Sequence, residues 1–112
     1  MRTVRRLLWW ASGGGRPPNG QAVVDAVTDI LDHQHAIESR SYDAKTGIMA
    51  VAAARRVLAA IRVRRSGPCQ LKAILDALER LKALQAASKG EYASGAATIG
   101  AIQGAIRTRF PA

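Results

Sequence analysis

Apolar residues return at helical spacing through most of this chain, and that spacing limits the folds open to it. From residue 21 onward, hydrophobic side chains recur every three or four positions, which lines one face of an α-helix. The sequence has no alternating run of β-branched residues and no Asn-Gly hairpin between apolar strands. The pattern predicts an all-α fold, a small bundle of about four helices over residues 19–112, preceded by a basic N-terminal arm over residues 1–18.

Short breaks in the periodicity set the expected helix ends. Asn19 and Asp43 are residue types that cap helix N-termini, so each is expected to cap the helix that follows it. Ser66-Gly67-Pro68 should end one helix and begin the next, because glycine suits a C-terminus and proline suits a first turn. Ser88 and Glu91 have the spacing of a capping box. The predicted helices cover, in order, about 20–39, 43–65, 68–87 and 89–109.

Each predicted helix has one apolar face, which we expect to form the core. Leu, Ile, Val and Phe together are only just above roughly 20% of the chain, the level below which chains tend to be disordered. The core should therefore be thin, so that a partner or a second copy would help to complete it. The expected core positions, helix by helix, are Val23, Val24, Val27, Ile30, Leu31, Gln34 and Ile37; Ala50, Ala54, Val57, Leu58 and Ile61; Leu71, Ile74, Leu75, Leu78, Leu81 and Gln85; and Tyr92, Ala96, Ile99, Ile102, Gln103, Ile106 and Phe110.

The last predicted helix also carries small residues at every fourth position. Ala96, Gly100 and Gly104 form a ridge that would let another helix approach closely. Each glycine inside a helix costs roughly 1 kcal/mol relative to alanine. We therefore expect tight helix packing along this ridge to compensate.

Charge is segregated along the chain in blocks. The net charge is +9, and Arg supplies most of the basic residues. Residues 19–43 contain five acids and one base, whereas residues 44–75 contain no acid. The bases in or beside the second predicted helix are Arg55, Arg56, Arg62, Arg64, Arg65, Lys45 and Lys72. Because arginine forks match phosphate oxygens in pairs, this block favours a polyanion as partner.

Three interpretations of the basic block remain open. It binds nucleic-acid backbone, it forms a protein interface, or it is a solvated face neutralised by the acids of the first helix within one chain or between copies. Asp76 and Glu79 point outward from the third helix, which leaves few side chains to read bases there. Sequence-specific DNA recognition is therefore less favoured than binding by shape and charge.

The N-terminal arm combines cations with aromatic rings. Arg5 and Arg6 precede Trp9 and Trp10, and residues 12–20 form a Gly/Pro linker, so the arm is expected to be flexible. The arm could stack bases, anchor in a partner's groove, lie at a lipid surface, or fold back on the bundle. We treat Trp9, Trp10, Arg5 and Arg6 as candidate partner anchors. Membrane binding is the least favoured of these options.

Nothing in the sequence supports catalysis or a cofactor. There is no phosphate loop, no nucleophile with a neighbouring base and no pair of acids in an apolar setting. Asp29 and His33 share a helix face, but His35 points away and a third metal ligand is not evident. The single cysteine, Cys69, excludes a disulfide within the chain. We expect a cytoplasmic protein that is not an enzyme, because no apolar run is long enough for a membrane span.

In general character, a small, Arg-rich, all-helical chain with a basic helix is similar to the small helical subunits of CRISPR effector ribonucleoproteins. Those subunits pack in rows along guide or target backbone and have no catalytic residues. Small helical phage virion or inhibitor proteins look similar at this level. The resemblance covers residues 20–110 and rests on no diagnostic motif. It implies a non-catalytic RNA- or DNA-binding subunit, and the alternative is a protein-interaction, virion or inhibitor module without nucleic-acid contact.

Overall fold

A computed structural model describes residues 19–88 and 94–111, and these form an all-α bundle. Its helices are α2 (Gly20–Ser39), α3 (Ala44–Ala59), α4 (Gly67–Ala87) and α5 (Gly95–Arg109). No strand occurs in the described ranges. The predicted fold class, a small bundle of four helices, is confirmed.

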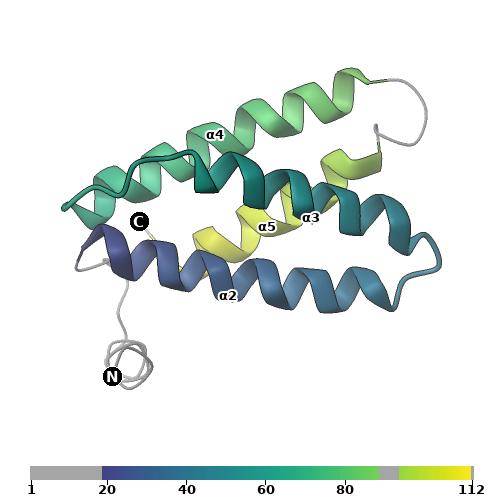
Figure 1. Cartoon of the computed structure of the whole chain (residues 1–112), viewed down its shortest axis with the longest axis horizontal. Coiled ribbons are helices and arrows are strands. Elements are labelled where there is room, and N and C mark those ends of the chain that lie inside the picture. The colour runs from purple at the N-terminus through teal and green to yellow at the C-terminus, as the bar shows by residue number, and fades with distance from the viewer. Residues whose placement is uncertain (1–18, 89–93, 112) are drawn as a thin grey trace.

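The helices pack so that every pair is in contact. In Figure 1, α2 and α3 run side by side as a hairpin, α4 lies along the other side of α3, and α5 passes behind α2 and α3. The α3–α4 connection and the end of α5 lie at one end of the bundle, and the α2–α3 turn lies at the other. This arrangement gives the molecule two chemically different ends.

The core lies between all four helices and is formed mainly by the predicted apolar faces. Ile99, Ile102 and Ile106 of α5 are completely buried, together with Val23 of α2 and Leu78 of α4. α5 therefore contributes one fully buried face to the core, even though its three glycines weaken it intrinsically.

The buried face of α3 differs from the predicted one. Val51 is completely buried but was not expected in the core, whereas Val57, Leu58 and Ile61 only pack against its edge. In α2, the predicted core residue Ile37 is 47% exposed. α3 buries its first three turns most deeply, and its C-terminal part lies at the surface.

The starts of α2, α3 and α4 lie where they were expected, but the side-chain cap expected from Asp43 is not formed. The side chain of Asn19 accepts a hydrogen bond from the Ala22 N–H at 2.8 Å, and Ser66 accepts one from the Cys69 N–H at 3.3 Å. Pro68 lies in the first turn of α4, as expected. Asp43 precedes α3 but makes no cap to the backbone, because its carboxylate accepts the Thr46 hydroxyl instead.

α3 ends at Ala59 and not at about residue 65, which corrects the predicted boundary. Residues 61–66 lie outside the helix, and two of their backbone groups bond to other elements. The Arg64 N–H donates to the side chain of Gln70 at 2.7 Å, and the Arg65 carbonyl accepts the Gly20 N–H at 3.1 Å. These tertiary bonds take up groups that a longer helix would use internally, so Arg62, Arg64 and Arg65 are not helical.

The expectations for the last helix also change. Ser88 is the C-cap of α4, and its hydroxyl donates to the Leu84 carbonyl at 2.9 Å, whereas the residue that precedes α5 is Ser94. Glu91 and Tyr92 lie outside the described residues. A Cβ added at Gly100 or Gly104 would meet nothing within 4 Å. Among the described residues, none therefore packs closely against Gly100 or Gly104, and the tight packing expected along the ridge is not seen there.

Candidate functional site

The arginines of the acid-free block are divided between a helix and the connection that follows it. Arg55 and Arg56 lie near the end of α3, where cations are favoured by the helix dipole. The α3–α4 connection carries Arg62, Arg64 and Arg65, and all three are exposed. We call these three residues the basic corner.

The backbone of the basic corner is held from two sides. Gly20, at the start of α2, donates its N–H to the Arg65 carbonyl at 3.1 Å, and a side chain at Gly20 would overlap the Arg64 carbonyl oxygen. From α4, Gln70 reaches the Arg64 N–H, and only 1% of Gln70 is exposed. The connection is therefore fixed to two helices while its arginine side chains remain exposed to solvent.

The arginines of the corner have no acidic partners in the part of the chain that the structure describes. Neither Arg56 nor any residue of the basic corner makes an ion pair with a residue in the described ranges. Arg64 donates only to the neighbouring Arg62 carbonyl, at 3.4 Å. These side chains retain donors that can bind an anion from outside.

Arg55 has a different environment. It bridges α3 to α2 through an ion pair with Asp32 at 2.7 Å, with the two side chains 41% and 62% exposed. The acidic and basic blocks therefore do meet within one chain at this pair. Exposed ion pairs are worth only about 0–1 kcal/mol, so a phosphate could compete with Asp32 for Arg55.

The two candidate lysines do not extend the corner equally. Lys45 lies in the first turn of α3, roughly 16 Å along the helix axis from Arg56 at 1.5 Å per residue. Lys72 lies in the first turns of α4, near the corner, but pairs with Asp76 at 2.8 Å. The hydrogen bond from Lys72 lowers the pKa of Asp76, with a further contribution from the charge of Arg80. Lys45 therefore belongs to another part of the surface.

α5 brings further cations to the same end of the bundle. Its last turn contains Arg107 and Arg109, and Figure 1 shows this turn at the end where α4 begins. Arg107 adds to the lowering of the Glu79 pKa, which arises first from hydrogen bonds donated by Gln103 and Lys82. Sequence analysis missed both arginines because they lie far along the chain from the acid-free block. The absence of acids within α5 was the available signal.

The opposite end of the bundle uses charge internally. Glu38 belongs to the acidic block of the sequence, but its carboxylate accepts the Gln34 amide at 2.8 Å and the Thr98 hydroxyl at 3.1 Å. Gln34 and Thr98 are both buried. Any side chain at Gly47 would overlap the Glu38 carboxylate, so glycine leaves it room. We call Gln34, Glu38, Gly47 and Thr98 the polar end.

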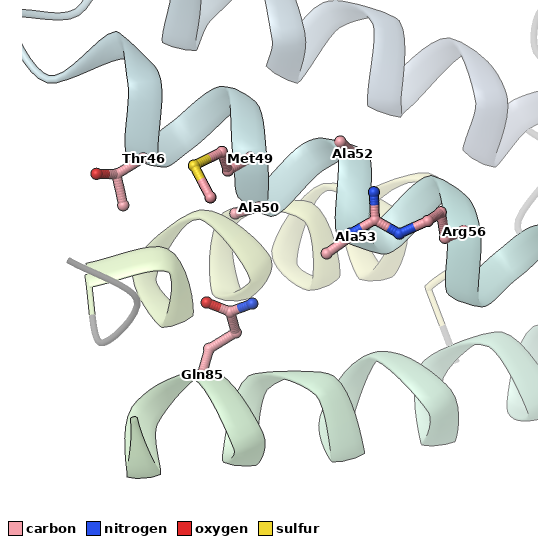
Figure 2. A pocket seen from close by; sticks show the side chains of 7 residues that line it. All are labelled: Thr46, Met49, Ala50, Ala52, Ala53, Arg56 and Gln85. Carbon is pink, nitrogen blue, oxygen red and sulfur yellow. The ribbon is translucent and has the colours of Figure 1, made fainter. Parts of the chain in front are cut away.

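A cavity of about 160 Å³ lies between α3 and α4. Figure 2 shows Gln85 rising from α4 toward Ala50, with Met49 on one side and Arg56 farther along α3. Among the described residues that line it, Arg56 is the only ionisable one.

The remaining candidates are the N-terminal anchor residues and the two histidines. Arg5, Arg6, Trp9 and Trp10 lie outside the described residues. His33 and His35 are exposed on α2. In the described parts of the chain, no three His, Cys, Asp or Glu side chains are grouped so that they could hold a metal ion.

Comparison with protein-family models, with curated proteins and with solved structures found no match. Among the helices described, none combines the length and the apolarity needed to cross a membrane.

Proposed function

We propose that the protein is a non-catalytic subunit of a larger assembly and contacts nucleic-acid backbone through the basic corner, with Arg55 and Arg56 beside it. The observation that carries this proposal is a set of exposed arginines that have no acidic partner among the described residues, on a backbone fixed by Gly20 and Gln70. The surface is a connection with the end of a helix, and not the continuous basic helix expected from the sequence.

The exposed guanidinium groups of the basic corner suit contact with phosphate better than contact with a nucleobase. Arginine forks donate paired hydrogen bonds to phosphate oxygens. Because the backbone of the corner is already held, binding would order only side chains, which lowers its entropic cost. Contact with about three to five phosphates predicts that log Kobs falls with log salt with a slope of about −3 to −5. Such contacts fix position but carry little sequence information.

Other surfaces of the bundle are suited to protein contacts in an assembly. Gly100 and Gly104 are open to a helix from outside, because no described residue lies within 4 Å of where their side chains would begin. Leu84 of α4 is 69% exposed, and Tyr42 is fully exposed in the α2–α3 turn. Neighbouring subunits or copies of the chain would cover such positions.

The test is binding to labelled single-stranded and double-stranded oligonucleotides across a salt series. Charge reversal of Arg62, Arg64 and Arg65 to Glu should flatten the salt slope by about 3, since each lost phosphate contact removes about one unit. The control reverses Arg40, Arg80 and Lys82, three bases outside the corner, which gives the same net charge. Equal losses in both variants would mean that net charge alone drives binding.

The competing function is a protein-interaction, virion or inhibitor module. The Asp32–Arg55 bridge favours it, because it shows that α2 and α3 surfaces can pair. In that case no oligonucleotide would bind even at low salt, and the protein would form an oligomer that dissociates as salt rises. That result would reject the nucleic-acid proposal.

A further inference from the structure

A groove of about 210 Å³ lies on the side of the bundle where α2, α3 and α4 meet. Its walls are mainly apolar and include Val24, Val27 and Leu31 of α2, Leu58 of α3 and Ile74 of α4. Val24 and Leu58 are only half-buried, so the groove leaves apolar surface in contact with water. Arg55 lines one edge, next to its partner Asp32.

The groove lies close to the point where the N-terminal arm joins the bundle. Asn19 caps α2, and Val24 follows only about one turn later. The far wall at Leu31 is roughly 16 Å along α2 from Gly20. Residues 11–18 can span up to about 26 Å when extended, so Trp10 can reach the whole groove.

The arm has the composition to fill such a site. Leu7, Leu8, Trp9 and Trp10 are consecutive apolar residues, and Trp buries a large area while its indole N–H keeps a polar contact. The Thr28 hydroxyl in the groove wall can accept that N–H, since it donates its own proton to the Val24 carbonyl. Arg55 is placed to meet an indole face.

Charge is complementary as well. The arm, residues 1–18, has four arginines and no acid, whereas α2 carries Asp25, Asp29 and Asp32. A helix face of this sign would attract Arg5 and Arg6 as the neighbouring apolar residues enter the groove. The tether adds an effective concentration in roughly the millimolar range, so modest contacts suffice.

We infer that residues 7–10 of the same chain dock in the groove between α2, α3 and α4. The groove is then a site for the arm, and a partner that captures Trp9 or Trp10 must first displace them from it. This inference shares Arg55 with the proposed nucleic-acid surface, but it can be tested on the protein alone, without nucleic acid.

Trp9 and Trp10 are the only tryptophans of the chain, so tryptophan fluorescence reports on the arm alone. Docking predicts emission at shorter wavelength than in the denatured chain, and several-fold weaker quenching by acrylamide. Thr28→Arg should shift emission to longer wavelength and restore quenching, because it fills the groove and repels the arm. Thr28 is exposed and bonds only within its helix, so the fold should survive.

Ala36→Arg is the matched control, since it adds the same charge at an exposed position of α2 outside the groove lining. It should leave emission unchanged. Emission like that of the denatured chain, or equal responses to both substitutions, would overturn the inference. A shift that disappears on dilution would also overturn it, by showing that the arm of a second copy occupies the groove.

Discussion

The two ends of the bundle use similar side chains in opposite ways. At the basic corner, buried Gln70 holds a backbone N–H of the connection, and the arginine side chains remain outside. At the polar end, buried Gln34 and Thr98 hold a side chain, the carboxylate of Glu38. The charged groups of the basic corner are therefore exposed to solvent, whereas the carboxylate of the polar end is hydrogen-bonded within the bundle.

This difference affects the surface charge of the protein. Glu38 is already hydrogen-bonded within the bundle and Asp32 is paired with Arg55, whereas Arg62, Arg64 and Arg65 have no acidic partner in the described ranges. Two acids of residues 19–43 are thus engaged in contacts within the bundle, whereas the arginines of the basic corner have no acidic partner among the described residues. The net charges of residues 19–43 and 44–75, counted from the sequence, therefore understate how strongly exposed positive charge exceeds exposed negative charge.

The largest effect on stability is expected from Gly20→Ala. Its Cβ would overlap the Arg64 carbonyl, so the connection must move and the bond to the Arg65 carbonyl is lost. We expect a loss of about 2–3 kcal/mol in the free energy of unfolding, from overpacking and one broken hydrogen bond. Urea denaturation measures it, and the displaced corner should also bind oligonucleotides more weakly.

Gly100→Ala is the control for this substitution. It should raise the free energy of unfolding by about 0.5–1 kcal/mol, because its Cβ meets no neighbour and alanine is the better helix former. A similar gain at Gly20 would show that the connection is not held against α2.

A smaller effect is expected at the polar end, from Gly47→Ala. Here the overlapping group is the end of a side chain, so the Glu38 carboxylate can move away and lose its bonds to Gln34 and Thr98. The better helix propensity of alanine offsets part of this loss, so the free energy of unfolding should fall by about 1 kcal/mol. In a Glu38→Ala background the same substitution should become stabilising. A double-mutant cycle by denaturation measures the coupling, and additive effects would contradict it.

The smallest effect is expected from acid titration of α4. Hydrogen bonds from Gln103 and Lys82 lower the pKa of Glu79 from its ordinary 4.5, and Lys72 lowers that of Asp76 from 3.8. Carboxylates with a lowered pKa stabilise the fold above their unfolded pKa, and this contribution disappears as pH falls through the folded value. Stability should therefore decline slightly below about pH 4.5. Denaturation as a function of pH measures the decline, and Glu79→Gln should reduce it; an unchanged profile would contradict the assignment.

Part of the candidate site could be predicted from the sequence. The cluster of Arg62, Arg64 and Arg65 is visible there, because residues so close along the chain must also lie close in space. The distance of Lys45 from the basic corner follows from the length of α3. The position of Arg107 at the same end of the bundle as the corner does not follow from the sequence. It depends on the antiparallel packing of α4 and α5, which no local pattern specifies.

The sequence by itself determined the helices and most of their starts. Hydrophobic spacing, the cap at Asn19 and the first-turn position of Pro68 depend on residues close together in the chain, so they can be seen without a fold. Only the tertiary structure decided where α3 ends and how Glu38 is used. Those outcomes depend on hydrogen bonds between residues far apart in the chain, from Gly20 to Arg65 and from Thr98 to Glu38, and such partners meet only when the helices pack.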